Sequence, residues 1–517
     1  MRHGRAALPL MLCSAAAASV IAVMAVWGLQ LLDDGYYYLQ VAWNISRGAG
    51  SSFDSINATN GYHPLWQLTL VPLHWLFQKA SAAWAAVVLQ TLLFAGSGLL
   101  LHRLVLRAGG TALSAAAACA VWVLNFWLWG KGAMSGMETG LLLLLVGLSL
   151  LLLLRVLRTG RGGWKLGVLL ALAAAARLDS LALAASSVVV LLVAGRRRAA
   201  AGAAVVPAGY LAVYLPVNAL LFGGATPVSG WIKSETGRRL LRRLVEHGDA
   251  SVLVHAMENV HGLVSLGGRL PWLLWGPGLA ALAAVAVLAR RRASPELRGL
   301  MEVCFGYAVL LVGFYSIMYP SLLGAYTYYW LPPLFCLVAV AFAAAGLLPR
   351  AVRRWALAAV LLLFVLFEGV YAADRLGSWS FTVLESERPD AAGVRYLNSL
   401  EGDVVVGSWD AGYVGYRCRH PVVNLDGLVS SYRYQRVLKE GGLAEWIRRQ
   451  GITHLANVDY YAGKRQLIEE ELEWQPVFAD TAEMPRPVSV FSLSPSDLEY
   501  ASRRLRVFYV YRRPGDS

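Results

Sequence analysis

Long apolar runs, separated by short polar segments, make up most of the chain before residue 373. A helix needs about 20 apolar residues to cross the hydrocarbon core of a membrane. Lipid offers the backbone no hydrogen-bond partners, so each crossing must be helical. The pattern therefore predicts a polytopic α-helical membrane protein with about eleven spans, the first of them uncleaved. These spans are expected at 7–29, 82–103, 111–129, 139–157, 165–177, 180–195, 199–221, 270–290, 300–319, 328–347 and 355–372.

One further apolar segment, 63–78, is short and contains Pro64, Pro72 and His74. We expect it to form an interfacial or re-entrant helix. Basic clusters support this choice, because cytoplasmic loops are enriched in Lys and Arg. If the N-terminus is cytoplasmic and 63–78 does not cross, every main basic cluster lies on the cytoplasmic side. The clusters are Arg103/Arg107, Arg155 to Lys165, Arg196 to Arg198, Arg290 to Arg292 and Arg350 to Arg354.

The same topology places three polar segments outside the cell or in the periplasm: 30–62, 222–269 and the tail from 374. We therefore expect a transmembrane domain at 1–373, carrying the two outer loops 30–62 and 222–269. Within the tail, 403–407 and 451–455 are typical of strands, and 443–450 is typical of a helix. This alternation predicts a soluble C-terminal α/β domain at 374–517, which has an ordinary domain size.

Composition agrees with a membrane protein: 57% of the 517 residues are hydrophobic and only 15% are charged. The net charge of +14 would suggest nucleic acid in a soluble protein. Here the basic residues are explained by topology, so we expect no nucleic-acid partner. The five cysteines are scattered and form neither a disulfide framework nor a zinc-binding spacing.

Two adjacent carboxylates, Asp33 and Asp34, follow the first span directly. Their repulsion raises one pKa and favours a cation or a shared proton, and either carboxylate could accept a proton from an attacking hydroxyl. The alternative is that they only end the span and cap the next helix. Nearby side chains could bind a sugar by stacking or hydrogen bonding. They are Tyr36, Tyr37, Asn60, Tyr62, His63 and Trp66.

These two stretches, Asp33 to Leu39 and Asn60 to Trp66, together resemble the first outer loop of GT-C class membrane glycosyltransferases. The likeness extends over roughly 1–372 and is strongest to cell-wall arabinofuranosyltransferases. More broadly, the chain is similar to protein mannosyltransferases and to the aminoarabinose transferases of lipid A. Enzymes of this class take sugars from polyprenyl phosphates. The resemblance implies that Asp33 or Asp34 is the catalytic base, and it does not choose between them.

Four other residues are candidates, each with a plainer alternative. Glu138, in a Gly-Met-Glu-Thr run similar to one in related transferases, could bind a sugar hydroxyl or complement a helix dipole. Lys233 could stabilise a departing phosphate or be a solvated loop lysine. Arg177 could contact the phosphate or form a buried structural pair with Asp179. Tyr328 could wall a sugar pocket or belong to an aromatic belt.

The sequence thus predicts an inverting glycosyltransferase in the inner or plasma membrane, acting on its outer face in cell-envelope glycan assembly. The partners are the bilayer, a polyprenyl-phosphate sugar and an acceptor hydroxyl on a glycan, lipid or protein. No cofactor is certain, and a divalent cation at the acid pair remains open. Two alternatives stay open: a transporter or flippase for lipid-linked sugars, and a non-catalytic envelope scaffold.

Overall fold

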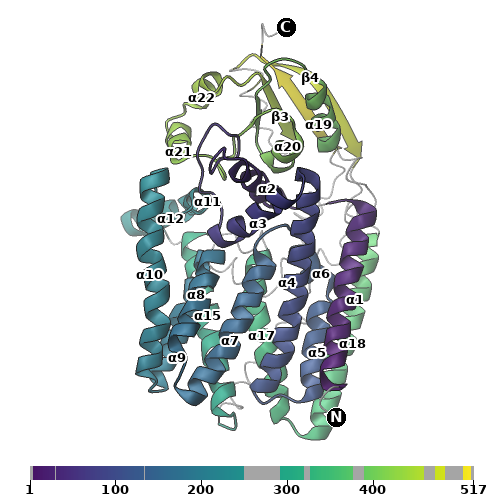
Figure 1. Cartoon of the computed structure of the whole chain (residues 1–517), viewed down its shortest axis with the longest axis vertical. Coiled ribbons are helices and arrows are strands. Elements are labelled where there is room, and N and C mark those ends of the chain that lie inside the picture. The colour runs from purple at the N-terminus through teal and green to yellow at the C-terminus, as the bar shows by residue number, and fades with distance from the viewer. Residues whose placement is uncertain are drawn as a thin grey trace.

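The computed structural model describes residues 4–29, 31–132, 134–249, 291–319, 327–376, 389–458, 468, 472–483 and 505–513. A long helical bundle carries a smaller domain with a β-sheet at one end (Figure 1). Among the described residues, six helices are long and apolar enough to cross a membrane. They are α1 (Gly4–Trp27), α4 (Lys79–Arg107), α7 (Thr139–Thr159), α10 (Arg197–Phe222), α15 (Pro295–Met318) and the Tyr328–Leu347 stretch built on α17 (Leu331–Ala344).

Three shorter apolar helices complete much of the bundle: α5 (Ala112–Val123), α8 (Gly163–Ala176) and α9 (Leu181–Val193). The helix α18 (Arg350–Leu376) covers the expected last span. The predicted membrane bundle is thus confirmed, and the expected span at 270–290 lies outside the described residues. The expected span 111–129 is interrupted, because Asn125 caps a separate short helix, α6 (Phe126–Lys131), by accepting a hydrogen bond from Leu128 N.

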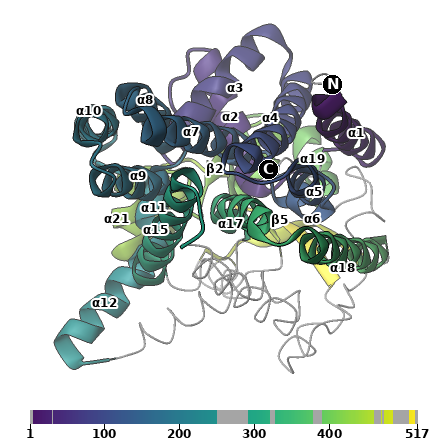
Figure 2. The ribbon, with the colours of Figure 1, turned by 90° about the horizontal axis from the view of Figure 1, so that it is seen from below.

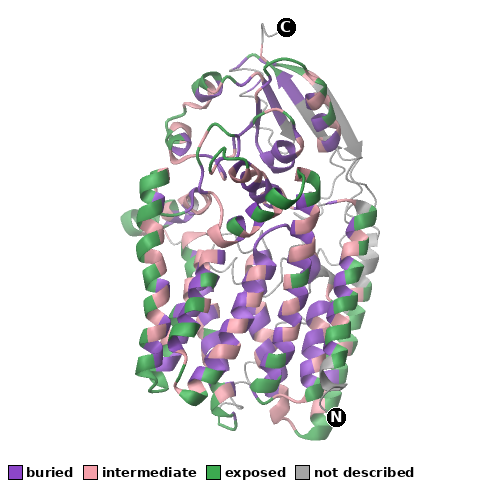
Figure 3. Cartoon of the chain, in the orientation of Figure 1, coloured by how far each residue is buried: buried purple, intermediate pink, exposed green. Residues whose placement is uncertain are grey.

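Burial follows the pattern expected of helices in lipid. Viewed along the bundle, α4, α7 and α8 lie on one side and α15 and α17 on the other (Figure 2). Buried residues gather between the helices, and exposed residues cover their outer faces (Figure 3). Large apolar side chains such as Leu220 and Phe305 are among the exposed ones. This arrangement places an apolar surface against the hydrocarbon core.

Two helices lie across the end of the bundle that carries the sheet: α2 (Asp33–Ser46) and α3 (Pro64–Leu76) (Figure 1). Pro64 suits the first turn of α3, where its missing N–H needs no partner. With 13 residues, α3 is shorter than a membrane crossing requires. The short apolar segment near 63–78 is therefore a helix that does not run the length of the bundle.

The run from 163 to 193 is broken by polar residues, as its sequence suggests. The helix α8 ends before Arg177, whose backbone is extended. A single 3₁₀ turn, η1 (Leu178–Ser180), then leads into α9. Each helix is too short to cross on its own, so their meeting point lies within the bundle.

The C-terminal region, here called the tail domain, contains a five-stranded sheet of order β2-β1-β3-β5-β4. The strand β1 pairs in parallel with β2 and β3, and β5 pairs antiparallel with β3 and β4. The elements are α19 (Pro389–Ser399), β1 (Val406–Ser408), α20 (Ala411–Arg417), β2 (Val422–Asn424), α21 (Tyr432–Lys439), α22 (Leu443–Arg449), β3 (His454–Val458), β4 (Gln475–Glu483) and β5 (Leu505–Arg512). The expected α/β fold is therefore present, with strands shifted by a few residues. The expected boundary at 373 falls within α18.

Small residues let α8 and α10 approach closely. A Cβ atom on Gly163 would lie 2.2 Å from the carbonyl oxygen of Ala199, and one on Gly167 would lie 2.5 Å from that of Gly202. Glycines four positions apart, on one face of a helix, allow this kind of backbone contact in membranes.

We therefore expect Gly167→Leu to destabilise the bundle by about 1–3 kcal/mol, because the added side chain must force α8 away from α10. Thermal melting of the purified protein in detergent would measure the loss. The matched control is Gly209→Leu on α10, where an added Cβ meets nothing within 4 Å. Equal melting temperatures for the two variants would contradict this account of the packing.

Candidate functional site

A cavity of about 590 Å³ is lined by residues of both the bundle and the tail domain. The tail contributes Leu428 and Val429. The rest come from the two expected outer loops, from η1 and from parts of α9, α10, α15 and η2 (Thr327–Trp330), together with His63, Met137, Glu138, Arg177 and Tyr319. Seven of the residues predicted from the sequence line this cavity. They are Asp34, Tyr37, Tyr62, His63, Glu138, Arg177 and Lys233.

The more exposed part of the cavity holds an ion pair between Asp34 and Lys233. The Lys233 Nζ atom lies 3.6 Å from Asp34 Oδ2, and the side chains are 21% and 27% exposed, respectively. Asp34 lies in the first turn of α2, where a carboxylate complements the helix dipole. Lys233 ends the short helix α11 (Val228–Lys233). We call Asp34 and Lys233 the outer pair.

The position of α11 depends on Asn60, which joins the two loops. Its Nδ2 atom donates to Asn218 Oδ1 (2.9 Å) and to the Thr226 carbonyl (3.0 Å). Its Oδ1 atom accepts from the Val228 backbone N–H at 3.0 Å. Asn60 is buried. Asn60 therefore does not line the cavity, and it anchors the segment that carries Lys233.

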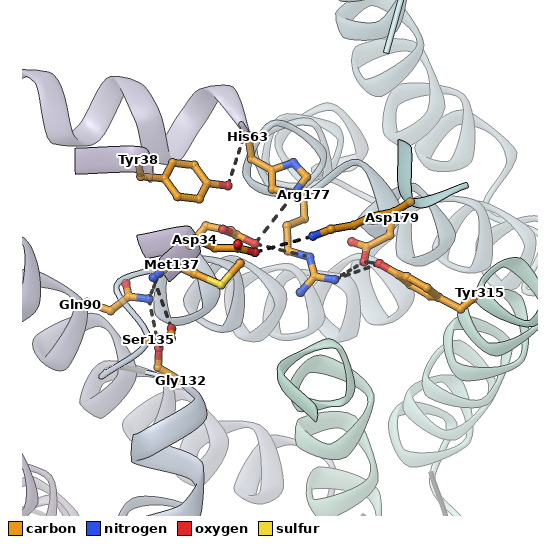
Figure 4. A network of polar contacts seen from close by, with 12 residues as sticks. Asp34, Tyr38, His63, Gln90, Gly132, Ser135, Met137, Arg177, Asp179 and Tyr315 are labelled. Atoms are coloured by element: carbon orange, nitrogen blue, oxygen red, sulfur yellow. Dashed lines mark hydrogen bonds and ion pairs between the residues drawn. The ribbon is translucent and has the colours of Figure 1, made fainter. Parts of the chain in front are cut away.

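A second, more deeply buried group surrounds the break between α8 and α9 (Figure 4). The Arg177 guanidinium lies 3.7 Å from Glu138 Oε1 and forms a close ion pair with Asp179 Oδ2. The Tyr315 hydroxyl donates to the same Asp179 oxygen at 2.6 Å. The side chains of Arg177, Glu138 and Asp179 are 1%, 1% and 7% exposed. We call these three residues the inner cluster.

Aromatic side chains and His63 enclose the inner cluster. Arg177 stacks over the Tyr329 ring at 4.6 Å. His63 Nε2 lies 3.9 Å from Glu138 Oε1. Burial lowers the pKa of His63 below its usual range, so the imidazole is neutral near pH 7 and its contact with Glu138 is no full ion pair. The arrangement combines hydrogen-bonding groups with flat aromatic surfaces.

Asp33 has a different environment from its neighbour. Its Oδ2 and Oδ1 atoms accept hydrogen bonds from the backbone N–H groups of Gly412 and Tyr413, both at 2.9 Å. These amides open α20, so Asp33 joins α2 to the tail domain. Burial raises the pKa of Asp33 to about 7, and the charges of Asp410 and Asp426 act in the same direction.

Tyr37 strengthens the same contact. Its hydroxyl donates to Asp426 Oδ2 and accepts from the Ala411 N–H at 3.2 Å and from Asn424 Nδ2 at 3.3 Å. Burial likewise raises the pKa of Asp426, to about 6. The tail segments near 410 and 426 are thus held against α2.

Three other predicted sugar-binding residues do not line the cavity either. Tyr36 donates to the Leu29 carbonyl at 2.7 Å and packs against the Tyr413 ring at 5.3 Å. Trp66 is fully buried and donates to the Gly136 carbonyl at 3.1 Å. Tyr328 is buried, whereas its neighbour Tyr329 lines the cavity.

Sequence reasoning missed several lining residues, including Tyr315, Tyr319, Arg238 and the tail's Leu428. Tyr315 and Tyr319 stand four residues apart at the end of an apolar span, which is a weak signal of a shared polar face. Leu428 carries no signal, because its position depends on how the tail domain docks. Among the described residues, no group of three or more His, Cys, Asp or Glu side chains could hold a metal ion.

Comparisons with known proteins agree with this architecture. The family model of glycosyltransferase family 87 matches residues 60–313, a range that contains Glu138, Arg177 and Lys233. The search of the curated proteins found no match. Two solved membrane proteins have a similar fold. The oligosaccharyltransferase AglB from Archaeoglobus fulgidus, in complex with an inhibitory peptide and a dolichol-phosphate, has a TM-score of 0.51 and 13% identity, covering 96% of this chain and 74% of that one.

ArnT from Cupriavidus metallidurans, bound to undecaprenyl phosphate, has a TM-score of 0.50 and 15% identity, covering 97% of each chain. At such identities these likenesses establish the fold. With the family match, they confirm the predicted resemblance to membrane glycosyltransferases of the GT-C class. The chain is a membrane glycosyltransferase with a fold of the GT-C type.

The Asp33 contact predicts that Gly412→Ala weakens docking of the tail domain. An added Cβ would lie 2.2 Å from the Asp33 carbonyl oxygen and 2.7 Å from its Oδ1 atom. Hydrogen–deuterium exchange of a peptide covering 409–417 should become several-fold faster. Gly209→Ala, which adds the same methyl group in open space, should leave this peptide unchanged. Unaltered exchange in Gly412→Ala would contradict the contact.

The raised pKa values of Asp33 and Asp426 predict that docking weakens as pH rises. The undocked carboxyls ionise near pH 4, whereas the docked ones ionise at about 7 and about 6. The docked state therefore binds more protons, and its extra stability is full below about pH 4 and lost as pH passes 7. Exchange of the 409–417 peptide, corrected for intrinsic rates, should be slower at pH 5 than at pH 8. Asp33→Asn should reduce this pH dependence.

Proposed function

We propose that this enzyme transfers a sugar from a polyprenyl-phosphate donor to an acceptor hydroxyl on the outer face of the membrane. The outer pair carries this proposal, because Asp34 and Lys233 place a proton acceptor and a cation side by side in the cavity. AglB and ArnT, whose folds are similar, are described with a dolichol-phosphate and with undecaprenyl phosphate, respectively. A lipid carrier of the same kind suits a cavity at the end of a membrane bundle.

The proposed reaction is a single displacement. The acceptor hydroxyl gives its proton to Asp34 as its oxygen bonds to the anomeric carbon of the sugar. The bond from that carbon to the phosphate oxygen breaks, and the polyprenyl phosphate departs with the electron pair. Lys233 stabilises the negative charge that develops on the phosphate. A single displacement inverts the anomeric configuration, and Asp34 afterwards returns its proton to water.

The location on the outer face is supported by the distribution of basic residues. The N-terminus and the starts of α10 and α18, with Arg196 to Arg198 and Arg350 to Arg354, lie at the end of the bundle away from the tail domain (Figure 1). Cytoplasmic loops are enriched in such residues. The arginines of α12 (Glu235–His247) lie at the opposite end and are the main exception. We therefore propose a cytoplasmic N-terminus in the inner or plasma membrane, a periplasmic or extracellular tail domain, and a function in cell-envelope glycan assembly.

The catalytic assignment predicts different effects for the two adjacent aspartates. Asp34→Asn should lower kcat by roughly 10²–10⁴-fold, the usual loss when a general base is removed. Asp33→Asn should retain most of kcat, because Asp33 does not line the cavity and the amide oxygen of Asn still accepts one of the two backbone hydrogen bonds that dock the tail domain. The assay uses purified protein with a cell-envelope lipid extract and quantifies the released polyprenyl phosphate by mass spectrometry.

Full activity in Asp34→Asn would exclude Asp34 as the base. A flippase would move lipid-linked sugars across vesicles without releasing polyprenyl phosphate. A non-catalytic scaffold would release no polyprenyl phosphate, and neither substitution would change that result. The same assay therefore separates the proposed enzyme from both alternatives.

A further inference from the structure

The inner cluster and the more exposed charged residues of the cavity differ in their net formal charge. The inner cluster sets the two carboxylates of Glu138 and Asp179 against the single guanidinium of Arg177. Nearer the solvent, Lys233 and Arg238 also line the cavity, close to Asp34 and Glu235. The buried part therefore has an excess of negative charge, and the more exposed part does not. This difference gives the cavity a polarity along which a ligand can be oriented.

The inner cluster also has unused hydrogen-bonding capacity. Glu138 Oε2, Asp179 Oδ1 and Arg177 Nη1 are buried and have no hydrogen-bond partner among the described residues. Leaving such groups unpaired costs free energy, so they are uncommon in folded proteins. All three side chains belong to residues that line the cavity. These atoms are buried in the cavity wall, and a small rotation of each side chain would present two acceptors and one donor to a ligand that enters the cavity.

A phosphate is poorly matched to this cluster. Arg177 is already shared between two carboxylates and stacked on Tyr329, and an added phosphate would be repelled by the net negative charge. A neutral sugar fits better, because its hydroxyls donate to carboxylate oxygens and its oxygens accept from the guanidinium. Charge-assisted hydrogen bonds of this kind are the stronger ones. Tyr315 and Tyr329 add flat walls on which a sugar ring can pack.

We propose that the inner cluster is the subsite for the donor sugar, in which hydroxyls of a neutral sugar bind Glu138 and Asp179. Arg177 then serves as the fixed counter-charge of these carboxylates, in agreement with the structural pair and not with the phosphate contact, the two roles that the sequence left open for it. The donor lies with its phosphate at Lys233 and its sugar directed inwards. This orientation rests on the proposed function, and it disfavours sugars that carry a carboxylate.

Binding measurements can test the orientation independently of catalysis. The protein is prepared with Asp34→Asn to prevent turnover. Its affinity is measured for undecaprenyl phosphate and for undecaprenyl phosphates that carry mannose, arabinofuranose or glucuronic acid. Glu138→Gln and Lys233→Met are then added singly to this background. Glu445→Gln, on an exposed helix of the tail domain, is the matched control for the carboxylate exchange.

We expect Glu138→Gln to weaken binding of the tighter-binding neutral-sugar lipid by about tenfold or more, the loss typical of a hydrogen bond to a charged group. The same variant should bind sugar-free undecaprenyl phosphate within about twofold of its parent. This second measurement also shows that the variant is folded. Lys233→Met should weaken the binding of both the neutral-sugar lipid and sugar-free undecaprenyl phosphate. The glucuronic acid lipid should bind more weakly than the neutral ones, and Glu138→Gln should narrow that gap.

If Glu138→Gln weakened the binding of the sugar-bearing and the sugar-free lipid equally, the phosphate would lie at the inner cluster and the proposal would be overturned. So would unchanged binding of the sugar-bearing lipid. The proposed function fails differently. The wild-type protein would then bind these lipids without transferring sugar, or would bind none of them.

Discussion

The structure depends on the contact between the Asp33 carboxylate and the backbone N–H groups of Gly412 and Tyr413 in the first turn of α20. This contact fixes the tail domain to α2, and the tail then supplies Leu428 and Val429 to the cavity wall. Close backbone approach supports it at a second point, since a Cβ on Gly61 would lie 2.0 Å from the Leu428 carbonyl oxygen. Without this docking, the cavity would lose one wall and stand open to water. Water would weaken each electrostatic interaction within it.

The same contact explains how two identical neighbours acquire different surroundings. Successive residues on a helix point about 100° apart, and α2 begins at Asp33. One carboxylate therefore faces α20 while the next faces Lys233. The two acids were expected to repel each other, but each carboxylate has its own partners. Asp33 accepts from the amides of α20, and Asp34 pairs with Lys233. Which of the two carboxylates faces Lys233 therefore follows from where α2 starts.

Much of the bundle could be predicted because burial in lipid leaves a strong sequence pattern. The apolar runs gave the helices, the proline-containing segment gave α3, and Arg177 and Asp179 marked the break between α8 and α9. The site was predictable only in part. Its polar residues stand out against an apolar background, so Glu138, Arg177 and Lys233 could be found. The Arg177–Asp179 pair could also be anticipated, because the two residues are neighbours in sequence. The docking contact could not, because Asp33 and Gly412 are 379 positions apart.

The direction in which the aromatic side chains point could not be predicted from the sequence either. Tyr36 and Tyr37 lie near the acid pair in sequence and Trp66 lies near His63, and all three were expected to face a sugar. Tyr36 and Trp66 instead pack into the core, and Tyr37 both lines the cavity and bonds to the tail domain. Nearness in sequence does not fix the direction of a side chain on a helix. Tyr328 and Tyr329 differ for this reason, since only the second reaches the cavity.

The break at Arg177 and the position of the cavity are one feature of the fold. Non-helical backbone at membrane depth is tolerated where it is buried in protein or lines a cavity, and residues 177–179 line this one. Arg177 follows the last turn of α8, where the partial negative charge of the helix end favours a cation. That cation in turn holds Glu138 and Asp179 in place. An unbroken helix through 163–193 would satisfy its own backbone and leave no polar end for the cavity, so the interruption that costs helical hydrogen bonds is what gives the enzyme its inner cluster.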